Sequence, residues 1–284
     1  MSASMLAFVL NDGLMKLLFV DWSIYQAIFL RGILTIPIML FIAWSRNQLF
    51  IKISPRDWKF ILIRTASEVG AAVFFLSALA HMPLANVTAI LQALPLVVTM
   101  VAALFLGEAV RWRRWIAISA GFIGVLIIIR PGLEGFSIYS LSALGAVICV
   151  TVRDLTTSRL SSDVPSMFVA LITGVAITGL GAVLLPTTIW APINESHWLI
   201  LTVASIAIVF GYLFSVMAMR YGETAFIAPF RYTAMLWAII FGILFFNDWP
   251  DELTVIGTII IVIAGVYSFH RERLQKASNV GTDN

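Results

Sequence analysis

The sequence predicts an all-α polytopic membrane protein, with ten transmembrane helices arranged as two inverted five-helix repeats. Three observations lead to this fold class. Of the 284 residues, 61% are hydrophobic and only 12% are charged, a balance that soluble domains of this length do not have. The apolar residues form long continuous runs, whereas a transmembrane barrel needs short segments of alternating polarity. The chain also repeats itself weakly at an offset of 140 residues.

Ten apolar runs can be marked along the chain, and a run of about 20 apolar residues crosses a bilayer. The first run lacks a basic n-region and an obvious small-residue cleavage site, so we expect a retained helix there and not a signal peptide. Connections are short, apart from a basic loop around 45–57 and a Pro-containing loop around 187–196. In order, the runs cover residues 4–20, 22–44, 58–80, 84–106, 113–130, 137–157, 165–186, 197–219, 223–246 and 253–270.

The basic residues predict the orientation of these helices. With the N-terminus in the cytoplasm, twelve lysines and arginines fall in the inner loops and the tail, and only Arg130 falls outside. Cytoplasmic loops carry the excess of basic residues, so both termini are expected in the cytoplasm, in agreement with an even number of helices. We expect a multi-pass protein of a bacterial inner membrane, embedded in the lipid bilayer.

The internal repeat divides the chain into two halves. At an offset of 140 residues Ala78 meets Ala218, and Glu108 meets Asp248 just past a helix in each half. Because five is an odd number, the second half must enter the membrane in the opposite direction. Inverted repeats of this kind are typical of secondary transporters, which bind substrate near the midplane between the halves. The expected units are a first repeat over 1–130, a second repeat over 137–270, and a polar cytoplasmic tail over 271–284.

Two stretches resemble the repeat of a known family. Residues 83–108 read PLANVTAILQALPLVVTMVAALFLGE and are followed by WIAISAGFIGV, while residues 222–248 read GETAFIAPFRYTAMLWAIIFGILFFND and are followed by IGTIIIVIAGV. This pattern of helix, acid and helix ending in Gly-Val resembles the EamA family of the drug/metabolite transporter superfamily. The resemblance covers nearly the whole chain and implies ten helices in two repeats. Members export amino acids, metabolites or drugs, and some import metabolites. Asn247-Asp248 departs from the Gly107-Glu108 form, so the second copy is the weaker match.

The ninth run carries Arg231 near the middle of the bilayer, two residues after Pro229. A charge at this depth is costly, so it normally faces a partner or a water-filled cavity. We expect Arg231 to face the central cavity and to bind the anionic group of the substrate, with Glu68 as its counter-charge when the site is empty. Small side chains share its face of the predicted helix: Ala228, Ala234 and Ala238.

Further charged side chains lie within the first three runs. Asp12 and Lys16 are four residues apart on one face, so they either form a local pair or leave Asp12 in the cavity as a proton or substrate contact. Arg31 is expected either in a structural ion pair or at the ligand. Arg64 lies near the cytoplasmic end and is expected to extend toward it. Glu68, close to mid-depth, either pairs with an arginine or titrates during transport.

Aromatic residues flank the candidate arginine. Phe226, Phe230 and Trp237 lie along one side of the ninth helix, where they either face lipid and pack or form the wall that holds an apolar substrate body. The candidate substrate contacts therefore include Phe230 and Tyr232 beside the charged residues.

Two other sets of residues are expected at helix contacts and not in the site. Arg153 and Asp154 lie near the inner end of the sixth run. The fifth and tenth runs carry small residues that let helix backbones approach closely, so we expect packing surfaces or a homodimer contact there. These small residues are Ala117, Ala120, Gly121, Gly124, Gly257 and Gly265.

The sequence offers no catalytic, cofactor or metal motif. His81, His197 and His270 fall at predicted helix ends, without metal-ligand neighbours at useful spacing. Serines lack a Gly-x-Ser-x-Gly setting, no Walker loop is present, and the single Cys149 excludes a disulfide framework. We therefore expect no enzyme, no cofactor and no metal. The net charge of +3 has a topological use, so no nucleic-acid partner is expected.

These features together predict a secondary active transporter, most simply an exporter of a small zwitterionic or anionic metabolite such as an amino acid, driven by protons or by exchange. Three of the five intramembrane charges considered are basic and two are acidic, a mixture that suits such a substrate better than a lipophilic cation. Alternatives are an importer of a vitamin-like metabolite, a multidrug exporter and, from another class, a membrane-embedded enzyme. The absence of a catalytic cluster counts against the enzyme.

Overall fold

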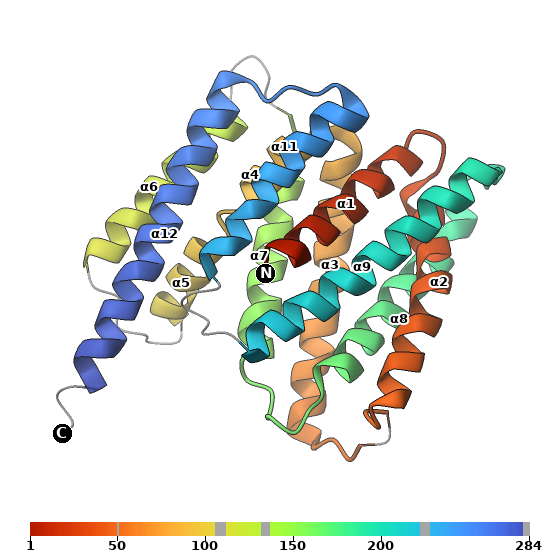
Figure 1. Ribbon diagram of the computed structural model, residues 1–284, viewed down its shortest axis with the longest axis horizontal. Helices are drawn as coiled ribbons and strands as arrows, with labels where there is room; N and C mark the ends of the chain where they lie inside the picture. Colours follow the sequence, from red (N-terminus) through yellow and green to blue (C-terminus); the bar gives the residue numbers. More distant parts are fainter. Residues whose placement is uncertain (50, 106–111, 132–136, 222–227, 281–284) are drawn as a thin grey trace.

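The computed structural model describes residues 1–49, 51–105, 112–131, 137–221 and 228–280, and every regular element in these ranges is helical (Figure 1). The sequence motifs at Gly107-Glu108 and Phe226 lie outside the described residues. The α-helices are α1 (Ser2–Leu18), α2 (Ile24–Ser45), α3 (Pro55–His81), α4 (Leu84–Leu91), α5 (Leu94–Phe105), α6 (Trp112–Ile129), α7 (Tyr139–Thr157), α8 (Ser166–Leu184), α9 (Glu195–Tyr221), α11 (Thr233–Phe246) and α12 (Glu252–Val280), with 3-10 turns η1 (Leu185–Thr187) and η2 (Ala228–Tyr232).

Eight helical segments of the described chain are long and apolar enough to cross a membrane, with α4 and α5 counted as one span. The shorter apolar stretch Phe230–Phe246 and the 17-residue α1 bring the helical segments to ten. The predicted all-helical membrane architecture is confirmed.

Helix starts follow from local capping residues. The Ser23 hydroxyl accepts a hydrogen bond from the Gln26 amide at the start of α2 (3.2 Å). At the start of α3, the Ser54 hydroxyl accepts from the Asp57 amide (3.0 Å), and Pro55 occupies the first turn. Such caps satisfy amides that have no partner within the helix, and proline costs nothing there because its missing donor would be unused.

The fourth span is broken into α4 and α5. Pro95 has no amide hydrogen to donate back to the Leu91 carbonyl, so the regular ladder fails just before it. The backbone tightens instead, and the Ala93 amide donates to the Ile90 carbonyl three residues back (3.1 Å).

The ninth span differs from the regular helix predicted over 223–246. Its described part begins with the 3-10 turn η2, and the α-helix starts only at Thr233. Arg231 therefore lies in a 3-10 turn at the start of α11, not in the middle of an α-helix. At the other end, Asn247 closes α11 in the left-handed conformation (φ 54°), which asparagine tolerates better than most residues.

The helices form a row of closely packed pairs (Figure 1). α6 lies against α12 at one edge of the molecule, and α2 lies against α8 toward the other. Between these edges α1 packs on α9 and α3 packs on α7, while α11 contacts both α1 and α4. Each of these pairs joins a helix of the predicted first half to one of the second half.

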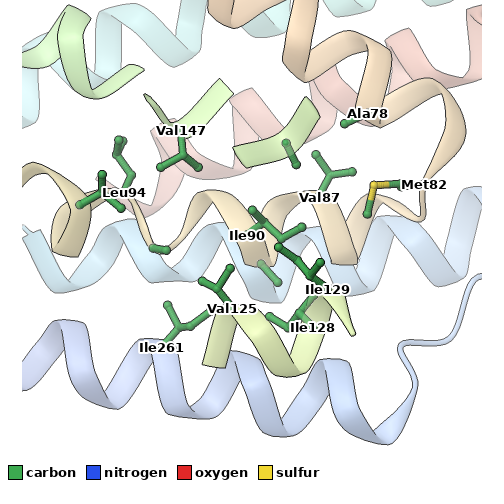
Figure 2. Packing of buried hydrophobic residues seen from close by; sticks show 14 of the residues in the cluster. Ala78, Met82, Val87, Ile90, Leu94, Val125, Ile128, Ile129, Val147 and Ile261 are labelled. Carbon is green, nitrogen blue, oxygen red and sulfur yellow. The ribbon is translucent and has the colours of Figure 1, made fainter. Parts of the chain in front are cut away.

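The largest apolar cluster surrounds α4 (Figure 2). Val87 and Ile90 of α4 are fully buried, and side chains from α6, α7 and α12 pack around them, among them Val125, Val147 and Ile261. In a membrane such contacts stabilise by close packing, because lipid tails are as apolar as the side chains. The cluster fixes α4 and therefore the position of the break that follows it.

Candidate functional site

An ion pair between α3 and α7 is the centre of a polar network inside the bundle. One guanidinium nitrogen of Arg153, Nη1, lies 3.1 Å from both carboxylate oxygens of Glu68. The same guanidinium contacts Asp154 Oδ1 at 2.8 Å through Nε and Nη2. The Glu68 side chain is only 12% exposed, so its charge is held by protein and not by solvent. Arg153 therefore neutralises two carboxylates at once.

This arrangement corrects two expectations. The counter-charge of Glu68 is Arg153, not Arg231, so the predicted resting pair is not formed. Arg153 and Asp154, which we expected only at a helix contact, are central to the network. No short-range pattern signals them, because Glu68 and Arg153 are 85 residues apart and meet only through the packing of α3 on α7.

Arg64 joins this cluster from the same helix as Glu68. Its Nε donates to the Thr157 hydroxyl (3.0 Å) and its Nη1 to the Thr173 hydroxyl (2.7 Å). Thr173 is buried on α8, so the guanidinium reaches into the bundle. Its other partner, Thr157, is the last residue of α7, so the extension of Arg64 toward the membrane surface stays a prediction.

A second group lies between α1 and α2. Arg31 Nη1 donates to the Asn11 side-chain oxygen (3.2 Å), and the Asn11 amide donates to Asp12 Oδ1 (3.0 Å). Asp12 and Arg31 also attract each other electrostatically. Asn11, which the sequence analysis missed, is buried and bridges the two charges. The predicted site residues Asp12 and Arg31 are thus brought together.

Lys16 does not pair with Asp12. Its Nζ donates to the backbone carbonyl of Met82 and lies 3.8 Å from Asp248 Oδ2. The ammonium therefore ties the end of α1 to the junction of α3 and α4 and to the loop after α11. Spacing of four on a helix allows a pair, but the nearer tertiary partners determine where this flexible side chain goes.

Tyr212 of α9 connects the two groups. Its phenol lies within electrostatic range of Glu68, Arg153 and Arg64 and also of Arg31. Beside it, a cavity of about 60 Å³ is lined by Arg31, Thr35, Thr173 and other residues of α2, α8 and α9. This volume holds a few water molecules but no metabolite. Tyr212 is the second residue that the sequence analysis missed, since a lone tyrosine in an apolar run carries no signal.

Arg231 approaches the network from η2. Its side chain is partly buried, and the charges that act on it are those of Asp154 and Arg153. Among the described residues it has no ion pair. Its backbone carbonyl accepts a hydrogen bond from Gln92 Nε2 (3.4 Å), and Gln92 lies in the break between α4 and α5. The break of the fourth span therefore faces the 3-10 turn η2 of the ninth span.

The neighbours of Arg231 have different surroundings. Ala234 and Ala238 are buried as expected from their small size, whereas the side chain of Ala228 lies outside the described residues. Tyr232 points to α12, where a methyl group on Gly265 would overlap its hydroxyl. Tyr232 thus packs between helices, and its substrate contact stays a prediction.

The aromatic wall predicted along the ninth helix is only partly described. Phe230 is 42% exposed. Trp237 packs against the apolar cluster of α1 and α3 and stacks on Phe241, with ring centroids 6.5 Å apart.

Four guanidinium groups and three carboxylates make up the network. The carboxylates of Glu68 and Asp154 share Arg153, and Asp12 lies near Arg31. Arg64 is held by hydroxyl groups, with Glu68 as its strongest electrostatic partner. Arg231 completes the set, so the ionised network carries one excess positive charge. In the described part of the chain, no three His, Cys, Asp or Glu side chains are placed to hold a metal ion.

Comparison with known proteins finds a transporter family and several transporters that are similar to this chain. A family model described as the EamA-like transporter family matches residues 1–130 and 137–269. The pseudopaline exporter CntI of Pseudomonas aeruginosa is 25% identical over 224 residues, which cover 77% of each chain. The S-adenosylmethionine uptake transporter of Rickettsia prowazekii is 24% identical over 69% of this chain and 66% of its own. The riboflavin transporter of Brucella anthropi is 29% identical over 69% of this chain and 73% of its own.

One solved crystal structure is similar over 96% of this chain and 98% of its own, with a TM-score of 0.63. Its sequence is 19% identical, so the likeness concerns the fold alone.

Proposed function

Because the chain belongs to the EamA-like transporter family, we propose that it is a secondary active transporter for a small metabolite that carries an anionic group, such as an amino acid. The relatives are transporters and not enzymes, which agrees with the absence of a catalytic motif in the sequence. The chemistry of the substrate is inferred from the polar network inside the bundle.

The excess positive charge of the network carries this proposal. An uncompensated charge inside a membrane protein is costly and normally faces a partner or water. Arg231 has no ion pair among the described residues, and the charges nearest to it, Asp154 and Arg153, have opposite signs. A carboxylate of the substrate would complete the balance, because a guanidinium holds it through two parallel hydrogen bonds. A lipophilic cation would add to the excess, so a multidrug exporter fits less well.

The helix contacts support the predicted inverted repeat. If the halves are exchanged, so that α1 is replaced by α7 and α9 by α3, the contact of α1 with α9 becomes the contact of α7 with α3. The same exchange replaces α2 by α8 and α6 by α12, so the contacts α2–α8 and α6–α12 each map onto themselves. We therefore propose two repeats over 1–130 and 137–270, related by an axis in the membrane plane, with the substrate site between them.

Orientation remains a separate proposal, based on the basic residues. Both termini would be cytoplasmic in a bacterial inner membrane, with 271–284 as a cytoplasmic tail. In a Cys149→Ala background, an impermeant thiol reagent should label Glu195→Cys on intact cells and should miss Lys52→Cys. Both positions are exposed at the protein surface. The opposite labelling pattern would invert the topology.

Direction and energy source can be tested together. One relative is an exporter and others are uptake transporters, so the assay must allow both directions. We propose export driven by protons or exchange, with Asp12 as the candidate proton carrier because its partly buried carboxylate accepts a hydrogen bond from Asn11 and lies near Arg31. Substrate efflux from proteoliposomes under an imposed proton gradient, with and without external substrate, separates the two driving forces.

The function itself is tested with a metabolite panel in proteoliposomes. The panel pairs each carboxylate compound with its neutral amide or ester, and includes riboflavin and S-adenosylmethionine. We expect transport of a carboxylate compound and at least tenfold weaker transport of its neutral partner. Transport restricted to lipophilic cations or to neutral compounds would refute an anion-binding site. An import activity for a vitamin-like metabolite, the alternative function, would appear as uptake in the same assay.

A further inference from the structure

A groove on the outer face of α6 and α12 is remote from the polar network. It has a volume of about 400 Å³, within the range of small-molecule sites. Ile116, Ala117 and Ala120 line it from α6, and Ile260, Ile263 and Ala264 line it from α12. The pair lies at one edge of the molecule (Figure 1), so the groove faces the lipid and not the transport path.

The crossing of the two helices gives the groove the shape of a wedge. At Gly124 and Gly257 the backbones nearly touch, since a methyl group on either glycine would lie within 2.8 Å of the carbonyl oxygen of the other. Away from this crossing the groove lies between the antiparallel helices, with Trp112 and Tyr267 in its lining. Arg113 lies eleven residues before Gly124, about 16 Å along the helix axis. The groove is thus closed at the glycine crossing and open toward Arg113.

The open end is basic and aromatic. The Arg113 guanidinium lies over the Trp112 ring, 5.4 Å from its centroid. On α12, Arg271 Nε donates to the Tyr267 hydroxyl (3.1 Å). Tryptophan and tyrosine concentrate at the level of lipid headgroups, and arginine forms strong paired hydrogen bonds with phosphate. Arg114, by contrast, is buried and donates to the Thr99 hydroxyl, so only one of the two adjacent arginines is directed to the groove.

The shape of the groove favours a flexible chain over another helix. Helices associate in membranes through small residues exposed on their surface. Here Ala117, Gly124 and Ala264 are already buried within the α6–α12 pair, and the exposed rim consists of Trp112, Ile116 and Ile263. A hollow centre with a bulky rim admits an acyl chain but keeps a second backbone at a distance.

We propose that this groove binds a phospholipid with an anionic headgroup. One acyl chain lies in the wedge between α6 and α12, and the phosphate is held by Arg113 and Arg271. Basic pockets between transmembrane helices bind anionic headgroups in the same manner.

Native mass spectrometry of the full chain in detergent tests the site, with phosphatidylglycerol as the probe and phosphatidylcholine of the same chain length as the matched lipid. We expect tighter binding of phosphatidylglycerol. Arg113→Gln and Arg271→Gln should each weaken it about fivefold, because a basic residue near the surface contributes about 1 kcal/mol. Ala120→Phe should abolish binding of both lipids by filling the groove.

Two control variants match these changes elsewhere on the protein. Lys59→Gln removes an exposed charge from α3, and Ala182→Phe adds bulk to an exposed position on α8. Both should leave lipid binding unchanged, and lipid-free melting curves check the fold of every variant. Equal affinity for the two lipids, or no effect of the arginine variants, would overturn the proposal. A dimer that Ala120→Phe dissociates would instead assign the groove to a second copy of the chain.

Discussion

Replacing Arg231 is the sharpest test of the proposed substrate site. A carboxylate held by two charge-assisted hydrogen bonds loses both in Arg231→Ala. Each such bond contributes about 1.5–3 kcal/mol, so the loss is at least about 3 kcal/mol, or more than 100-fold in the half-saturation concentration. Arg231→Lys keeps the charge but loses the paired geometry, and about a tenfold effect is expected.

The stability of the Arg231 variants should change little. Asp154 attracts this guanidinium and Arg153 repels it, so the two interactions with the folded protein oppose each other. Arg153→Ala is the matched comparison, because it leaves Glu68 and Asp154 without their shared cation. Breaking a buried pair in this way costs about 3–5 kcal/mol of folding stability.

Substrate transport in proteoliposomes measures the half-saturation concentration, and melting curves in detergent measure the folding stability. The expected pattern is a stable but inactive Arg231→Ala and a destabilised Arg153→Ala. Near-normal transport by Arg231→Ala would refute the assignment of the substrate anion to this residue. Loss of stability equal to that of Arg153→Ala would show that Arg231 is structural.

Other variants test individual contacts by thermal melting. Glu68→Arg combined with Arg153→Glu should be more stable than either single change, because the swap restores opposite charges across α3 and α7; a double variant no better than the singles would show that the pair is not coupled. Gly265→Ala should destabilise the protein by about 1–3 kcal/mol, since the added methyl group would meet the Tyr232 hydroxyl. Tyr232→Phe should be neutral or stabilising, because that buried hydroxyl has no hydrogen-bond partner in the described structure. A clear loss of stability in Tyr232→Phe would reveal a partner for the hydroxyl.

The helices were predictable because their apolar runs are long, and this signal depends only on local composition. The start of α3 at Pro55 likewise follows from its serine cap and its proline. The break before Pro95 has a clear local cause, yet the apolar run continues through it and hides it.

The pairing of charges was less predictable. Glu68, Asp12 and Arg31 were identified as buried polar residues, since a charge in an apolar run is conspicuous. Their partners depend on which helices pack together, and the sequence spacing says nothing about that. Glu68 meets Arg153 because α3 packs on α7, and Lys16 meets Asp248 because the loop after α11 lies beside the end of α1.

The contact between the break of the fourth span and the 3-10 turn η2 of the ninth span has an electrostatic consequence of its own. α5 begins at Leu94 and α11 begins at Thr233, so both helices start beside the contact of Gln92 with the Arg231 carbonyl. A helix carries about half a positive charge at its N-terminus, from amide groups that have no partner within the helix. η2 runs directly into α11, so Arg231 itself lies in the first turns of that helix, beside the start of α5. We expect the backbone amides of these first turns to favour an anion beside Arg231, and part of that attraction would persist after the arginine is removed.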